Sequence, residues 1–337
     1  MLTAQLMSPM SFLIPFPPIR RPLPLALVVI GMVTLPLLAG SAAAQTQGAT
    51  EPSHLATNPV YASLVQAAES ELIRLNEPRF ADGQTAEQQR MELSRVGGDR
   101  YSIEALLRPS PLAPHVLQME RQRIDARQAT AQRVRIVFML QGELETFAQE
   151  SFLNSLLAGG DDTEDAAGGS RALADEELQA AGVNSLSAAG SSEASSPEQR
   201  WQQEHYRLVH GELFSRVRFS GVVRSFATRS DDSVLLALRF DERFARVPGL
   251  AGVWQRLERD QAGVLQMAER GDFLGGGAYI KITRWREDPR MLVFEAELLL
   301  LEPQAWFGGS NLLGSKLPPA IQAQVREIRR AALRAAP

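Results

Sequence analysis

Two pairs of ionisable side chains are spaced so that each pair could share one site. His210 and Glu212 stand two residues apart, and Glu295 and Glu297 repeat that spacing nearer the C-terminus. Both pairs lie in runs where apolar and polar residues alternate. Because successive side chains of a strand point to opposite faces, residues two apart point to the same face. Each pair would therefore place two polar groups on one side of a strand.

Such pairs have two chemical uses. Carboxylates at a defined separation, one with a raised pKa, hydrolyse glycosidic bonds, usually from different structural elements. A histidine beside a carboxylate can bind a metal ion when a third ligand is available. The simpler interpretation of Glu295 and Glu297 is the solvent face of an amphipathic strand. No H-E-x-x-H motif or three-ligand set occurs, so we predict no metal site and no cofactor.

Other catalytic motifs are missing from the sequence. There is no G-x-S-x-G nucleophile elbow, and the absence of cysteine excludes a cysteine nucleophile. The run Gly275-Gly276-Gly277 lacks the Lys-Ser/Thr of a phosphate-binding loop and precedes a strand, which favours a turn. These absences favour a non-catalytic protein, with a hydrolase that uses His210, Glu212, Glu295 and Glu297 as the alternative.

A group of large apolar residues follows the last predicted strand. Trp306 and Phe307 precede two glycines, and Leu312 and Leu313 follow them. Large apolar side chains on a flexible loop predict a lid or a contact with a ligand or partner. The alternative is that these residues close the end of the core.

The N-terminus predicts export. Arg20 and Arg21 precede an apolar run from Leu23 to Leu38, and small residues follow up to Ala44. This is the order of a secretory signal peptide, so we predict that residues 1–44 are removed and that the protein is periplasmic or secreted. A membrane anchor is the alternative, but the run is short for a membrane span and contains prolines. Membrane contact is expected only through an uncleaved signal segment.

Composition limits the classes of partner. The chain has 337 residues, 45% of them apolar, so it can bury a large core. Its formal net charge of -4 provides no global basic field, which argues against nucleic acid as a partner. Without cysteine an exported protein has no disulfides, so its stability must come from packing.

The pattern of elements predicts an α+β fold in which an antiparallel sheet is flanked by helices. Apolar and β-branched runs predict strands at 134–144 and at several places between 206 and 303. The last two strands, 278–285 and 291–301, read as a hairpin. Helical spacing predicts further elements at 59–75, 85–97, 116–131, 145–157 and 248–270, and a basic helix after Pro318 and Pro319.

Residues 159–199 differ in composition from the rest of the chain. They combine acidic residues with Ala, Gly and Ser and contain no aromatic residue. Such a segment buries too little apolar surface to offset the entropy of ordering it, so a disordered acidic linker or insertion is predicted. The predicted organisation is a signal peptide (1–44), a flexible lead-in (45–58), an α+β part (59–158), the acidic segment (159–199) and a β-rich part with a terminal helix (200–337). Two small domains joined by the acidic segment are the alternative.

These observations predict an exported, non-catalytic binding or interaction protein of the cell envelope. An apolar small molecule between the sheet and its helices, or another envelope protein, is the expected partner. A structural envelope component is a further alternative, and it would expose a broad apolar patch.

Overall fold

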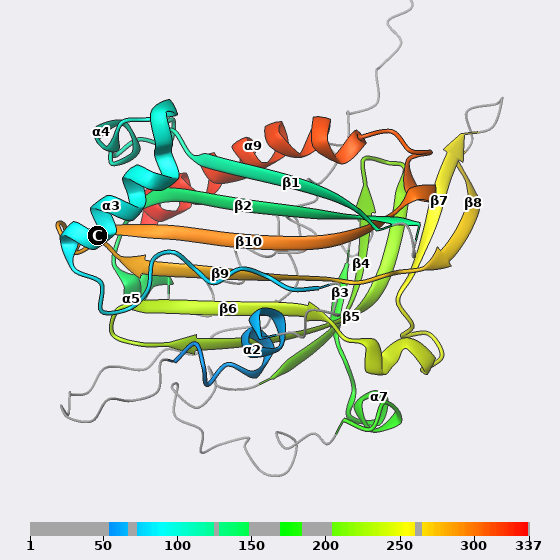
Figure 1. Ribbon diagram of the computed structural model, residues 1–337. Helices are drawn as coiled ribbons and strands as arrows, with labels where there is room; N and C mark the ends of the chain where they lie inside the picture. Colours follow the sequence, from blue (N-terminus) through cyan, green and yellow to red (C-terminus); the bar gives the residue numbers. More distant parts are fainter. Residues whose placement is uncertain are drawn as a thin grey trace, which may run out of the picture.

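The structure is a computed structural model in which one large sheet carries helices on both faces (Figure 1). The predicted α+β class, an antiparallel sheet flanked by helices, is confirmed. The predicted signal peptide and most of the predicted lead-in lie outside the described residues. The structure describes residues 54–66, 73–124, 128–147, 169–183, 204–259 and 265–335.

Within these residues ten strands form the sheet, and every pairing is antiparallel. Eight of them lie in the order β1-β2-β10-β9-β6-β5-β4-β3, and β7 and β8 extend from β5. The strands are β1 (Val116–Ile124), β2 (Ala129–Gln141), β3 (Ser170–Ala172), β4 (His205–Leu213), β5 (Val217–Arg229), β6 (Ser233–Phe240), β7 (Val253–Arg259), β8 (Leu265–Asp272), β9 (Gly276–Arg284) and β10 (Met291–Pro303).

The helices are short, except α3 and the C-terminal helix. They are α2 (Pro59–Val65), α3 (Ala86–Gly97), α4 (Ile103–Leu106), α5 (Leu144–Phe147), α7 (Asp175–Ala180) and α9 (Leu312–Ala335), with 3-10 turns η1 (Gly98–Arg100), η3 (Glu242–Arg246) and η4 (Gln304–Trp306).

The two halves of the chain meet in the middle of the sheet. The hairpin of β9 and β10 was predicted and is confirmed, and β10 also pairs with β2 along its whole length. The rings of Phe294 and Phe138 lie at paired positions and stack with centroids 4.5 Å apart. A strand from residues 129–141 and a strand from residues 291–303 therefore share one apolar layer.

β5 is one continuous strand that changes partner along one of its edges. Residues 223–229 pair with β6, and residues 217–220 pair with β7. Gly221 lies at the change, where an added Cβ would come within 3.1 Å of the Phe240 ring. A residue without a side chain is needed there because another element approaches closely.

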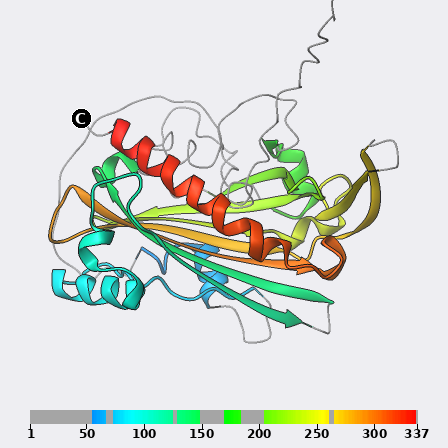
Figure 2. The same cartoon turned by 90° about the horizontal axis from the view of Figure 1, so that it is seen from above.

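The long helix α9 lies across one side of the sheet, which we call the helix face (Figure 2). Apolar residues recur along α9 at spacings of three and four, which places them in one stripe. The stripe packs on inward-facing residues of β2, β9 and β10. It consists of Leu313, Leu317, Ile321, Val325, Ile328 and Ala332.

The opposite side of the sheet is the strap face, named for residues 73–82, which we call the strap. Here α2 packs against β5, β6 and β9, and α3 and α4 pack near one end of β2 and β10 (Figure 1). The Asn58 side chain caps α2, with Pro59 at its first position. Thr85 and Gln88 form a capping box at α3. Both starts agree with the predictions, but α2 ends at Val65, well before residue 75.

The described residues of the predicted helix 116–131 form the edge strand β1 and the start of β2 in place of a helix. As an edge strand, β1 has one neighbour, and its polar residues remain exposed while Leu117 and Met119 contact the core of the helix face. Half-exposed strands with many Arg and Gln residues lack the apolar runs by which strands are recognised.

The predicted helix at 248–270 is also wrong, because β7 and β8 form a hairpin there. Trp254 and Leu257 are both buried on β7 although they are three residues apart. The pairing register shifts between Gln255 and Leu257, where β8 has one residue more than β7. A spacing of three between buried apolar residues is typical of a helix.

The acidic segment is ordered in its middle. Ser170–Ala172 pairs with β4 as β3, and Leu178 and Val183 pack on the sheet. The prediction of disorder is therefore wrong for residues 169–183, and the rest of 159–199 lies outside the described residues. His54, expected in a flexible lead-in, is likewise ordered, and its Nε2 lies 2.9 Å from Ser233 Oγ.

Candidate functional site

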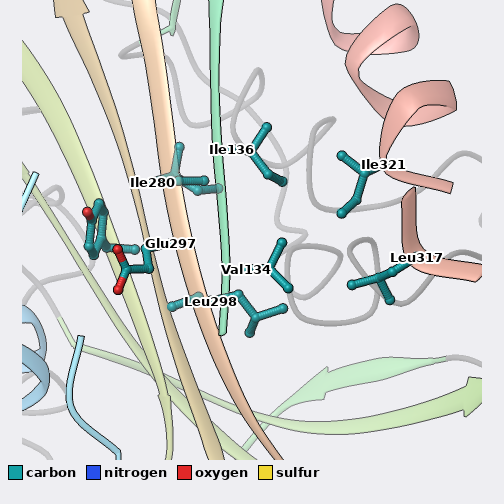
Figure 3. A pocket seen from close by; sticks show the side chains of 10 residues that line it. Val134, Ile136, Ile280, Glu297, Leu298, Leu317 and Ile321 are labelled. Atoms are coloured by element: carbon teal, nitrogen blue, oxygen red, sulfur yellow. The ribbon is translucent and has the colours of Figure 1, made fainter. Parts of the chain in front are cut away.

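A small cavity lies on the helix face, between the sheet and α9. Its volume is about 20 Å³, room for about one water-sized probe, and the side chains that face it are apolar. Figure 3 shows Val134, Ile136 and Leu298 on the side of the sheet toward α9, with Glu297 on the other side. The lining residues are Val134, Ile136, Ala278, Tyr279, Ile280, Ala296, Glu297, Leu298, Leu317 and Ile321.

The backbone of α9 is interrupted beside this cavity. Pro318 and Pro319 lie inside the helix and immediately follow Leu317, which lines the cavity. Proline has no N–H to donate, so the first turns of α9 lack two backbone hydrogen bonds. Gly308 and Gly309 precede the helix with φ of 58° and 80°. Residues 312–317 are therefore joined to the rest of the chain at two weak points.

The predicted contact residues lie at this end of the molecule. Trp306 and Leu313 are fully buried, whereas Phe307 and Leu312 are partly exposed. The Trp306 ring stacks on Phe273 with centroids 5.9 Å apart. Two of the four residues thus belong to the core and two lie at its margin.

Glu295 and Glu297 do not face solvent, contrary to the prediction. Their exposed fractions are 1% and 0%, and both point to the strap face of β10. Glu297 Oε1 accepts hydrogen bonds from the backbone N–H of Asn76 (2.9 Å) and from Arg133 (2.7 Å), and Glu297 Oε2 accepts one from Arg135 (2.7 Å). Alternation along the strand was predicted correctly, but the strap covers the polar side.

Glu295 holds the next part of the strap. Its Oε2 accepts a hydrogen bond from the backbone N–H of Arg79 at 2.9 Å and another from Phe80 at 3.3 Å. Burial raises the pKa of Glu295 and lowers the pKa of the neighbouring Lys281. Lys281 Nζ donates to the Phe80 carbonyl and to Asp82, both at 2.7 Å. The cluster therefore pairs its buried charges, as buried charges require.

A Ser-His-Asp combination occurs within this cluster, but its geometry differs from that of a catalytic triad. Nε2 of His54 lies near both Ser233 Oγ (2.9 Å) and Asp82 Oδ2 (3.1 Å). A triad uses the two ring nitrogens separately, one for the serine and one for the aspartate. His54 Nδ1 is buried and has no partner among the described residues. The arrangement fixes the strap to the sheet.

His210 and Glu212 lie far along the sheet from the other two candidates. They are on β4, and β5, β6 and β9 separate that strand from β10. His210 is exposed. Glu212 pairs with Arg218 at 3.4 Å. The structure thus does not bring the four residues to one cleft.

The sequence did not reveal the partners of the buried carboxylates. Arg135 and Lys281 lie in predicted strands at positions that indicate solvent exposure. Arg133 immediately precedes the predicted strand 134–144, and Asp82 lies in a loop. A repeated match of opposite charges across paired strands is the pattern that would have found them.

The described residues show neither a metal-binding cluster nor a membrane-spanning helix. They contain no group of three His, Asp or Glu side chains placed to hold a metal ion. In the same parts of the chain, no helix has the length and apolar character needed to cross a membrane.

Comparisons with known proteins give little further information. No protein-family model and no curated protein matches the sequence. Three solved structures show distant likenesses, each at 8% identity. Human STARD10 has a TM-score of 0.34, with 75% of this chain and 83% of that chain covered. The lipid transfer and protein localization domain of human StarD13 (DLC2) has a TM-score of 0.32, with 63% and 83% covered.

The third structure, CalU16 from Micromonospora echinospora, has a TM-score of 0.19, with 66% of this chain and 98% of that chain covered. Likenesses at this level do not establish a shared fold or a shared ligand.

Proposed function

We propose that this protein binds an apolar small molecule between its sheet and α9, without catalysis, and that it acts as an exported protein of the cell envelope. The observation that carries the proposal is the cavity between the sheet and α9, where the side chains are apolar. Protein interiors are normally packed without such voids, and an apolar void stays dry and accepts apolar guests.

The present size of the cavity requires α9 to move when a ligand binds. A volume of about 20 Å³ holds no molecule larger than water, so a ligand must lift part of the helix from the sheet. The segment 312–317 is the part best suited to this movement, because Gly308–Gly309 and Pro318–Pro319 flank it. Its Leu313 and Leu317 would exchange contacts with the sheet for contacts with the ligand.

The proposal of non-catalytic binding is supported by the positions of the candidate carboxylates. Hydrogen bonds to the strap and to arginine hold Glu295 and Glu297 on the face opposite the cavity. His210 and Glu212 lie three strands away. A ligand on the helix face would meet none of these four groups. Export remains a proposal that depends on residues 1–44 alone.

Native mass spectrometry tests the proposal. The protein is purified gently from the envelope fraction of its own host, and its mass is compared before and after denaturation. We expect an excess mass that denaturation removes, on a chain that begins at Gln45. An Ala296→Leu variant should lose the excess mass because Ala296 lines the cavity, whereas Ala323→Leu, on the exposed side of α9, should keep it.

The outcomes separate the alternatives. A monomer without excess mass, in the parent protein and in both variants, would refute ligand binding. An excess mass that survives in Ala296→Leu would place the ligand elsewhere on the protein. A second protein that co-purifies would favour the structural envelope role. A chain that begins upstream of residue 45 would refute cleavage after Ala44.

A further inference from the structure

Two buried oxygen atoms on the helix face have no hydrogen-bond partner among the described residues. They are Oε1 of Gln132 on β2 and Oε2 of Glu302 on β10. The residues are 3% and 4% exposed. Buried polar atoms are nearly always paired in native structures, and each unpaired one needs a physical explanation.

Both residues lie beyond the lining of the cavity, on the same face of the two strands that supply Val134 and Leu298 to it. Val134 and Leu298 line the cavity and are paired across β2 and β10. The next residues that point to the same face are Gln132, paired with Leu300, and then Glu302, paired with Thr130. Gln132 and Glu302 are thus diagonal neighbours across the two strands, a separation within reach of long side chains.

A buried position such as that of Glu302 is unfavourable for a charged carboxylate that has no hydrogen-bond partner. Burial raises the pKa of Glu302 to about 7, and the nearby positive charge of Arg121 opposes this rise. Arg121 lies on β1, which β2 separates from the strand of Glu302, and the Arg121 side chain is exposed. An unpaired buried acceptor has lost its hydrogen bonds to water without gaining others, which destabilises the folded protein. A ligand that donated hydrogen bonds to both oxygens would remove that destabilisation.

We propose that Gln132 and Glu302 form the polar end of the ligand site and receive a hydrogen-bond donor. The ligand would be a neutral amphipathic molecule whose headgroup carries a hydroxyl or amide N–H. This inference rests on the proposed function. The headgroup lies near the end of β10, beyond the pair Val134 and Leu298, and the apolar body extends along the cavity beneath α9. Two acceptors favour a donor and disfavour an anionic headgroup.

The test compares two probes with the same apolar body. 1-Decanol carries a hydroxyl donor, and decyl methyl ether does not. Both are titrated by native mass spectrometry into delipidated mature protein. We expect the parent protein to bind decanol about ten-fold more tightly than the ether, as the one hydrogen bond that a hydroxyl donates would provide. The Gln132→Leu and Glu302→Leu variants should lose this preference and retain the affinity for the ether.

A matched control is Glu212→Leu, a carboxylate on β4 outside the proposed site, which should retain the preference. Binding of neither probe to the parent protein would refute the proposed function itself. Equal binding of both probes would leave the proposed function standing and overturn the polar site. A preference for decanol that persists in both Gln132→Leu and Glu302→Leu would also overturn it.

Discussion

Replacing Glu302 with glutamine should stabilise the ligand-free protein by an amount that grows above about pH 4.5 and is complete at neutral and alkaline pH. Burial raises the pKa of this carboxyl group from its usual 4.5 to about 7 in the folded protein. Each pKa unit corresponds to about 1.4 kcal/mol, so ionisation of Glu302 in the folded state should cost about 3 kcal/mol at pH 8. Glutamine has nearly the same shape and cannot ionise.

The sign of the effect follows from proton binding. Below about pH 4.5 Glu302 is protonated in both folded and unfolded chains, so the parent protein and Glu302→Gln should be equally stable. Between about pH 4.5 and 7 the folded state binds the proton more tightly, and the parent protein loses stability as the pH rises. Above pH 7 the difference should remain constant at about 3 kcal/mol in favour of the variant.

Urea unfolding at pH 4, 6 and 8, followed by circular dichroism, measures this difference directly. The slopes against urea should match between the two proteins, because the same surface is exposed on unfolding. Subtracting the variant from the parent protein removes the pH dependence of every other group. A difference that does not change with pH, or equal stability at pH 8, would show that Glu302 is solvated or paired in the folded protein.

Two further predictions concern the strap and α9. Glu297→Gln should destabilise the protein by about 3–5 kcal/mol in urea unfolding, because Arg133 and Arg135 would lose a buried charged partner; a loss below 1 kcal/mol would contradict the importance of this cluster. Replacing Pro318 and Pro319 together with alanine should restore two backbone hydrogen bonds in α9. The rate of amide hydrogen exchange in residues 312–322 and the rate of ligand release should then both fall. An unchanged exchange rate would show that the prolines do not loosen the start of the helix.

Local sequence patterns predicted the parts of the fold in which neighbours along the chain decide the structure. The capping box at Thr85 and the hairpin of β9 and β10 are of this kind. The prediction for β1 was wrong because an edge strand with one buried side lacks a recognisable apolar run. The hairpin of β7 and β8 was predicted as a helix because Trp254 and Leu257, both buried, are three residues apart.

The candidate carboxylates were misjudged for a different reason. Alternation correctly assigned Glu295 and Glu297 to one face of β10, but it carries no information about what covers that face. The covering strap lies more than 200 residues away in sequence. Likewise, nothing local to Glu302 distinguishes it from a solvent-facing glutamate at the end of a strand.

The two faces of the sheet are held by different kinds of force. On the strap face, directional hydrogen bonds run from backbone N–H groups of residues 76, 79 and 80 to fixed carboxylate oxygens. On the helix face, α9 is held largely by apolar contact, which has no preferred direction and weakens on cooling. Hydrogen bonds therefore fix the strap in one position on the sheet, whereas cooling should weaken the contact between α9 and the sheet.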